Sequence, residues 1–212
     1  MKTGDATHLV FLDIETFSGE KPRLDEFTAD GRLKDPVKIE GDLLKKQEAG
    51  WRKQSLDPFK GEVIVIGLAI DDQEPFCIAE STEKGTLIAF DAWLYDYMNC
   101  NVIGHNIIDF DGYWLFIKGL KYSLPHIVHK FCDKIWLKDT MIMMDGPSWK
   151  RMTSLDKMAK NFGQSGKGDI DGGMVHDMYL DGKIEQIKSY CQSDVGILRE
   201  CYKALNASGI YT

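Results

Sequence analysis

The chain has 212 residues, a formal net charge of −7 and 43% hydrophobic residues, which is ordinary for one soluble globular domain spanning residues 1–212. No apolar run approaches the length of a membrane span, and the N-terminal residues lack the pattern of a signal peptide. The five cysteines contain no CxxC pair and are odd in number, so they indicate reduced thiols and a cytoplasmic location. We therefore expect neither a membrane protein nor a disulfide framework.

Strands and helices alternate along most of the chain. Strands are predicted at 8–15, 63–70, 75–81 and 101–104, an apolar segment at 135–144, and helices at 83–98, 109–119, 154–161 and 183–206. Adjacent early strands followed by alternating helices and strands predict an α/β fold with a mixed sheet and helices on both faces.

Residues 18–60 interrupt this pattern between the first two strands. An unstructured loop of that length is unusual in a compact domain. The stretch that begins at Pro36 and contains Leu43, Leu44 and Trp51 has helical character, which predicts an inserted helical arm. A flexible lid is the alternative.

The first strand, VFLDIETF, carries two carboxylates among apolar residues. Side chains alternate along a strand, so Asp13 and Glu15 point to the same face, close enough to repel each other. Burial of an unpaired carboxylate costs several kcal/mol or forces its protonation. Something must therefore compensate these two charges.

A second polar group lies in GHNIIDFDGYWL, at the junction of the predicted strand 101–104 and the following helix. Ligand sites of α/β sheets lie at such strand ends. Helix capping explains one polar residue there, either Asn106 or Asp109, but it rarely requires two acids and an asparagine. Asn106 and Asp111 are therefore candidates for a site.

The third group lies in SYCQSDVGIL, within the last predicted helix. Tyr190 and Asp194 are four residues apart and share one helix face. Apolar residues mark the packed side of the helix, so this pair borders the core. Taken alone, the motif favours a tyrosine packed in the core and an aspartate at its edge.

In this order and at this spacing, the three motifs resemble the DEDD superfamily of 3′–5′ exonucleases. Tyr190 is similar to the tyrosine of the DEDDy branch, whereas the histidine branch needs a histidine where this chain has Ser189. The resemblance is to proofreading domains of family B DNA polymerases and to stand-alone phage or bacterial exonucleases. It covers most of the chain, including DTMIMM (139–144), SLDKMAKNFG (154–163) and residues 167–195. Residues 35–58 resemble an arm of some stand-alone members.

The resemblance implies a ribonuclease H-like fold and a two-metal-ion site for Mg²⁺ or Mn²⁺. Asp13, Glu15 and Asp194 would hold the first cation, and Asp13 and Asp111 the second. Independently, clustered carboxylates need counter-charge, and their hard oxygens suit these cations. His126 and His129 are too few for a zinc site.

The remaining residue roles also follow from the resemblance. Tyr190 would orient the attacking water, since a tyrosine hydroxyl, with a reference pKa of about 10, is a poor base. The residues predicted to contact the terminal nucleotide are Thr16, Phe17 and Asn106. Phe17 would offer a stacking face.

The predicted reaction removes nucleoside 5′-monophosphates from single-stranded or frayed DNA 3′ ends. No polymerase fits in 212 residues, so we expect a stand-alone enzyme, with replication or repair proteins as its candidate partners. RNA 3′ ends are the alternative substrate, and a catalytically silent nucleic-acid-binding module is the alternative class. The latter is disfavoured because all four acids and Tyr190 are present.

A basic segment supports a nucleic-acid partner despite the negative net charge. Between Lys118 and Lys167, ten Lys or Arg outnumber four Asp, a local charge of +6. Such a stripe can meet a phosphate backbone. A solvated surface with surplus lysines is the alternative interpretation.

Overall fold

The computed structural model describes residues 7–146, 152–166, 168 and 170–209. It divides the chain into two compact units, the first formed by residues 1–15 and 63–212 and the second by residues 16–62. The strands are β1 (His8–Phe17), β2 (Glu62–Ile70), β3 (Phe76–Ile78), β4 (Cys100–Gly104) and β5 (Leu137–Asp139). The helices are α1 (Pro36–Lys53), α2 (Glu83–Asp96), α3 (Asp111–Tyr122), α4 (Pro125–Phe131), α5 (Thr140–Asp145), α6 (Leu155–Asn161), α7 (Val175–Leu180) and α8 (Ile184–Ala207).

The five strands form one mixed sheet in the order β3-β2-β1-β4-β5. β1 pairs in parallel with β4, from His8 opposite Cys100 to Phe11 opposite Ile103, and β4 pairs in parallel with β5. β2 and β3 form an antiparallel pair. The carboxyl ends of β1, β4 and β5 therefore lie at the same edge, where sheets of this class bind ligands.

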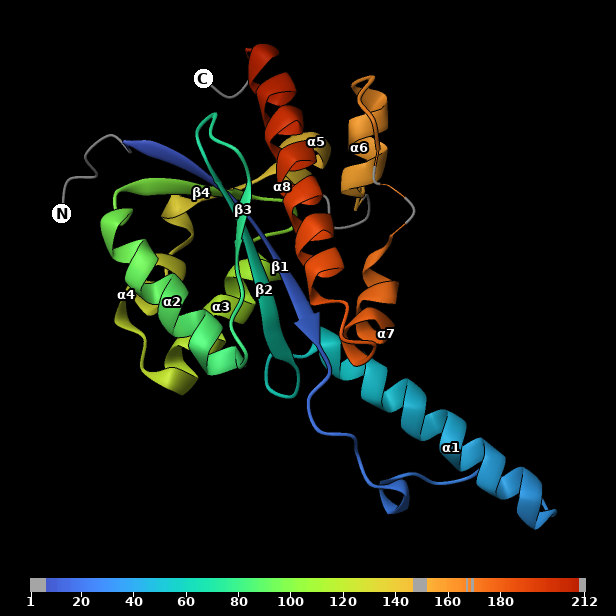
Figure 1. Cartoon of the computed structure of the whole chain (residues 1–212). Helices are drawn as coiled ribbons and strands as arrows, with labels where there is room; N and C mark the ends of the chain where they lie inside the picture. The colour runs from blue at the N-terminus through green and yellow to red at the C-terminus, as the bar shows by residue number, and fades with distance from the viewer. Residues whose placement is uncertain (1–6, 147–151, 167, 169, 210–212) are drawn as a thin grey trace. The chain divides into compact units, whose positions relative to one another are not determined.

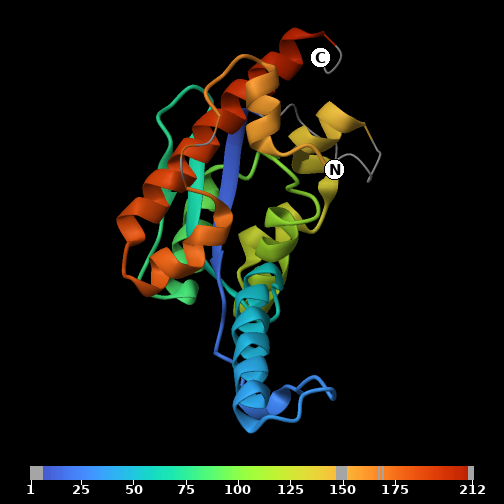
Figure 2. The ribbon, with the colours of Figure 1, turned by 90° about the vertical axis from the view of Figure 1, so that its right-hand side faces the viewer.

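Helices cover both faces of the sheet (Figures 1 and 2). Leu12 and Ile14 of β1 belong to an apolar cluster with residues of α2, α3 and α4. Phe11 belongs to a second cluster, formed with residues of α6 and α8. Consecutive side chains of β1 thus enter opposite halves of the core, as strand geometry requires. The predicted α/β class and mixed sheet are confirmed.

The predicted elements differ from the observed ones mainly at their ends. The predicted strand 75–81 is reduced to the three residues of β3, which lies at the edge of the sheet. The apolar segment 135–144 is divided into a 3₁₀ turn, β5 and α5. The division occurs at Asp139, whose carboxylate accepts hydrogen bonds from the N–H groups of Met141 and Ile142 and so starts α5.

The second unit contains the helical insertion predicted between the first two strands. Asp35 caps α1 by accepting from the N–H of Val37, and Pro36 occupies the first helical position. Trp51 of α1 donates from its indole nitrogen to the carbonyl of Gly19 (2.7 Å). The extended chain that precedes α1 is thereby tied to the helix.

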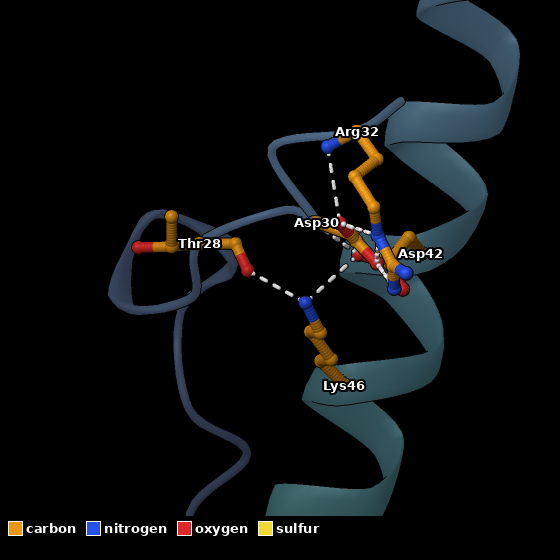
Figure 3. A network of polar contacts seen from close by, with 5 residues as sticks. All are labelled: Thr28, Asp30, Arg32, Asp42 and Lys46. Carbon is orange, nitrogen blue, oxygen red and sulfur yellow. Dashed lines mark hydrogen bonds and ion pairs between the residues drawn. The ribbon is translucent and has the colours of Figure 1, made fainter. Parts of the chain in front are cut away.

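A polar network ties the same two segments together at the middle of α1 (Figure 3). Lys46 Nζ lies 2.9 Å from Asp42 Oδ2 and donates to the carbonyl of Thr28 (2.8 Å). Asp42 also accepts from the N–H of Asp30 (2.9 Å). The Arg32 guanidinium beside Asp30 holds the pKa of that carboxyl at about 2.

Among the residues that the structure describes, no helix combines the length and apolar character needed to cross a lipid bilayer.

Candidate metal-dependent active site

β1 directs its two acids away from the cluster that contains Leu12 and Ile14. Asp13 and Glu15 share a strand face with Phe11, which packs against α6 and α8. Glu15 is only 7% exposed, and Asp13 is half-buried. The acid pair therefore lies on the α8 side of the sheet, near the carboxyl end of the central strand.

α3 brings Asp111 to the same place. Asp111 is the first residue of α3 and is 3% exposed. Its Oδ1 accepts a hydrogen bond from the backbone N–H of Ile14 (3.0 Å), the residue between the two acids of β1. A carboxylate in the first helical turn is also favoured by the helix dipole. By contrast, the neighbouring Asp109 is exposed.

α8 forms the remaining side of the candidate site. Cys191 Sγ lies 3.6 Å from Asp13 Oδ2 and 3.7 Å from the Asp13 carbonyl oxygen. Asp194 follows Cys191 by three residues and therefore lies on the same helix face, one turn along. Tyr190 and Asp194 are buried, at 8% and 2% exposure. The helix thus presents the third sequence motif toward β1.

Tyr190 also borders an open pocket of about 460 Å³. The other lining residues come from the exposed side of α8 and from the chain before α7: Gly168, Ile170, Glu185, Gln186, Ser189 and Ser193. The tyrosine therefore lies at the edge of a hollow that opens to solvent, about one turn of α8 before Asp194.

The electrostatics of the cluster favour a cation. One carboxylate oxygen each of Asp13 and Glu15 and the sulfur of Cys191 all lie within 4.8 Å of one another. Two ionised carboxylates at that separation repel by about 3.5 kcal/mol at an effective dielectric constant of about 20. Hard carboxylate oxygens suit Mg²⁺ or Mn²⁺, so the carboxylates of Asp13 and Glu15 fit such a cation.

The same surroundings change the pKa of the Cys191 thiol. A hydrogen bond with Cys77, burial, and the charges of Asp13 and Glu15 together raise the pKa of Cys191 well above its ordinary value. Negative charge at this position is therefore disfavoured unless a cation joins it.

Asp139 also supports this region, although the sequence did not indicate it. It is 5% exposed, and its carboxylate accepts from the backbone N–H groups of Asn106 (3.0 Å) and Ile108 (3.2 Å). Asn106 has a φ of 63°, a left-handed conformation that asparagine tolerates. Asp139 thus fixes the turn that leads into Asp111. A strand-ending aspartate before a helix is a capping signal, but the sequence gives no sign of its contact with the distant turn.

The predicted substrate residues Thr16 and Phe17 belong to the second unit. Thr16 Oγ1 donates to the carbonyl of Ser55 (2.6 Å). Phe17 is 9% exposed and packs edge-on against Trp51, with ring centroids 6.1 Å apart. In the first unit, the backbone of Asn106 is held by Asp139. The roles of these three residues toward a nucleotide stay predictions.

Two lysines of the basic segment are buried rather than on the surface. Lys118 is 1% exposed and pairs with Glu83 at 2.8 Å. Lys130 is fully buried, donates to the carbonyl of Cys100 (2.9 Å), and has its pKa lowered by burial. Lys150, Arg151 and Lys167 lie outside the described residues. The prediction of a phosphate-binding stripe is therefore wrong at Lys118 and Lys130, which serve the core.

The fold and the acid cluster together define a class. The chain has a ribonuclease H-like α/β fold of the kind found in exonucleases, with carboxylates gathered at the carboxyl end of the central strand.

Comparisons with known proteins agree with this class. A family model described as a predicted 3′-5′ exonuclease related to the exonuclease domain of PolB matches residues 127–197, which include Tyr190 and Asp194 but not the acids of β1 and α3. No curated protein sequence matches. The comparisons support a 3′–5′ exonuclease in general.

The structural comparison concerns the fold. One similar solved structure is the family B DNA polymerase from the hyperthermophilic archaeon Pyrobaculum calidifontis, with a TM-score of 0.60 and 16% sequence identity over 93% of this chain. The chain spans 24% of that polymerase. At this identity, the likeness shows the fold alone.

Proposed function

We propose that this chain is a metal-dependent 3′–5′ exonuclease that removes nucleoside 5′-monophosphates from single-stranded or frayed DNA ends. The observation that carries the proposal is the set of contacts around the end of β1. Asp13 and Glu15 lie within 4.8 Å of each other, Asp111 accepts from the N–H of Ile14 between them, and Cys191 of α8, which lies between Tyr190 and Asp194 in sequence, contacts Asp13. Three of these acids are at least nine-tenths buried. Such a cluster has a physical reason to exist when it holds cations.

In this proposal, Asp13, Glu15 and Asp194 would hold one divalent cation, and Asp13 with Asp111 would hold a second, either Mg²⁺ or Mn²⁺. When bound, the cations supply Lewis acidity to the phosphate and make the attacking water more acidic. β1 holds Asp13 and Glu15 on one strand face, and the hydrogen bond from Ile14 ties Asp111 to the backbone between them. The acids therefore have little freedom to turn away.

Tyr190 keeps its proton and orients the attacking water through a hydrogen bond from its hydroxyl. The water oxygen forms the new bond to the terminal phosphorus, and the bond to the leaving 3′ oxygen breaks. The water's proton leaves to solvent, and the 3′ oxygen takes one up. The pocket that Tyr190 borders is the place we propose for the terminal nucleotide.

The direct test uses 5′-labelled single-stranded DNA and RNA with Mg²⁺ or Mn²⁺. The proposal predicts a ladder of shortened DNA that is lost in Asp13→Asn and Asp194→Asn and kept in Asp109→Asn, which alters an exposed acid near the site. A ladder on RNA alone would make RNA the substrate. Tight binding without hydrolysis of either would leave a silent binding module. The proposed replication or repair partners and the cytoplasmic location need separate tests.

A further inference from the structure

The buried sulfur of Cys191 is a part of the acid cluster that the proposed hydrolysis does not use. Cys191 is fully buried, and its Sγ lies 3.6 Å from Asp13 Oδ2. Glu15 offers a carboxylate oxygen within 4.8 Å of both. Thiolate sulfur is a soft ligand that Mg²⁺ does not favour and that Zn²⁺ and Cd²⁺ do.

The thiol of Cys191 donates a hydrogen bond to Asp13, and the separation of the two atoms also matches the ligand spacing of a tetrahedral metal site. With Zn–S of about 2.3 Å and Zn–O of about 2.0–2.2 Å, the two ligand atoms of a tetrahedral ion lie about 3.5 Å apart. The observed distance from Cys191 Sγ to Asp13 Oδ2 is 3.6 Å. Glu15 offers a third donor, because one of its carboxylate oxygens already lies within 4.8 Å of both atoms.

The sulfur is also fixed in direction by an independent feature of the sheet. A Cβ placed on Gly67 of β2 would lie 2.6 Å from Cys191 Sγ and 3.0 Å from a methyl group of Val195. Only a glycine allows α8 to approach β2 this closely. The sulfur is therefore wedged between β2 and Asp13 and is already oriented toward the acids.

We propose that Cys191 makes the acid cluster a mixed oxygen–sulfur site, in which Asp13, Glu15 and Cys191 bind one soft or borderline cation such as Zn²⁺ or Cd²⁺. On binding, the S–H bond breaks, its proton passes to solvent, and sulfur bonds to the metal without any change of oxidation state. This cation competes with Mg²⁺ for Asp13 and Glu15. The competition rests on the proposed function, whereas the binding does not.

The test is a titration of the purified chain with Cd²⁺ alone, followed by the ultraviolet charge-transfer absorption of a sulfur–cadmium bond. The starting protein carries Cys132→Ser, because Cys132 is exposed and would bind cadmium on its own. We expect an absorption band that saturates at one equivalent of Cd²⁺. The band should be lost in Cys191→Ser, whose affinity for Cd²⁺ should be at least about ten-fold weaker, and it should be kept in Cys201→Ser. Cys201 is a second buried thiol of α8.

Cys77→Ser separates the two neighbouring thiols, since Cys77 lies opposite Gly67 in the β2–β3 pair. A band that persists in Cys191→Ser, or that is lost in Cys77→Ser instead, would overturn the proposal. A cadmium NMR spectrum of the protein with Cys191 intact tests the same point without that substitution. A shift typical of sulfur ligation supports the site, and a shift typical of oxygen ligands alone contradicts it.

Inhibition links the site to the proposed reaction. If the chain hydrolyses DNA with Mg²⁺, the Zn²⁺ concentration that halves each protein's own Mg²⁺ rate should rise at least about ten-fold in Cys191→Ser and stay constant in Cys201→Ser. A half-inhibiting Zn²⁺ concentration that rises in Cys201→Ser but not in Cys191→Ser would contradict the competition. A cadmium band in a protein without nuclease activity would sustain the metal site and overturn the proposed function.

Discussion

Glu83 and the acid cluster at the end of β1, both in the first unit, have different kinds of neighbours. Glu83, at the start of α2, is 7% exposed and is surrounded by donors. It pairs with Lys118 (2.8 Å) and Lys121 (2.9 Å) and accepts from Tyr122 Oη (2.6 Å) and the N–H of Val63 (3.0 Å). The chain itself supplies the cations that this carboxylate needs.

The acid cluster at the end of β1 has a different composition. Asp13 has a second carboxylate and a thiol as close neighbours, and Asp111 is held by a backbone N–H. These neighbours of Asp13 are therefore another acid and a thiol, and two ionised carboxylates 4.8 Å apart repel by about 3.5 kcal/mol at an effective dielectric constant of about 20. The difference teaches that the neighbours of a buried acid, rather than its burial, distinguish a structural charge from a candidate metal ligand.

The largest expected effect is on activity at the acid cluster. Asp13→Asn keeps the size of the side chain but removes the charge shared by both proposed cations. We expect Mg²⁺-supported hydrolysis of DNA to fall by about 10³-fold or more, since the metals contribute several kcal/mol to the barrier. Gel assays of labelled DNA measure the rate, with Asp109→Asn as the control. A fall of less than ten-fold would contradict the metal-site role of Asp13.

The second expected effect is on stability at Glu83. Glu83→Gln leaves the buried ammonium of Lys118 without its carboxylate, which should lower the free energy of unfolding by about 3–5 kcal/mol. Asp111→Asn, measured in the same urea titration without divalent cations, should cost far less because the asparagine oxygen can still accept from the N–H of Ile14. Equal losses in the two variants would remove the distinction between the two groups.

A smaller effect is expected at Tyr190. Tyr190→Phe removes one hydroxyl from a side chain that is otherwise packed against the core. Loss of a single donor that orients the reacting water should lower kcat by about 10²-fold while leaving KM nearly unchanged. Steady-state kinetics on a short oligonucleotide would show this. A rise in KM at constant kcat would assign Tyr190 to substrate binding instead.

The smallest effect is a pH dependence at Glu83. Burial opposes its ionisation, but Lys118, Tyr122 and Lys121 outweigh burial and hold the pKa of this carboxyl below its ordinary value of 4.5. Because folding lowers the pKa of Glu83, its ionised carboxylate stabilises the folded protein at pH values above the pKa of Glu83 in the unfolded chain. This contribution disappears as the pH falls through the pKa of Glu83 in the folded protein. The free energy of unfolding should therefore decline below about pH 4.5, with a shallower slope in Glu83→Gln. Parallel slopes would contradict this ion pair's contribution.

The sequence predicted the parts of the site that depend on local geometry. Strand alternation placed Asp13 and Glu15 on one face, and helical spacing placed Tyr190 with Asp194. It could not predict the contact of Cys191 with Asp13, because these residues are 178 positions apart and meet only where α8 packs closely on β2.

Long-range partners also explain the error in the basic segment. A charge count places Lys118 on the surface, but Glu83 lies 35 residues earlier and draws it into the core. The contact of Asp139 with the backbone of Asn106 is of the same kind, since it joins strand ends that only the sheet brings together. Local patterns thus gave the elements and candidate acids, whereas tertiary packing decided which charges face solvent.

The most direct test of the central claim is the melting temperature with and without Mg²⁺ at neutral pH. The charge-cluster account predicts that Mg²⁺ raises the melting temperature of the unmodified chain. Binding at a hundred times the Kd adds about 2.7 kcal/mol to the free energy of unfolding. Asp13→Asn should melt at or above the unmodified chain without Mg²⁺ and below it with Mg²⁺. Equal melting temperatures of the unmodified chain in both conditions would contradict the claim that its clustered acids bind a cation.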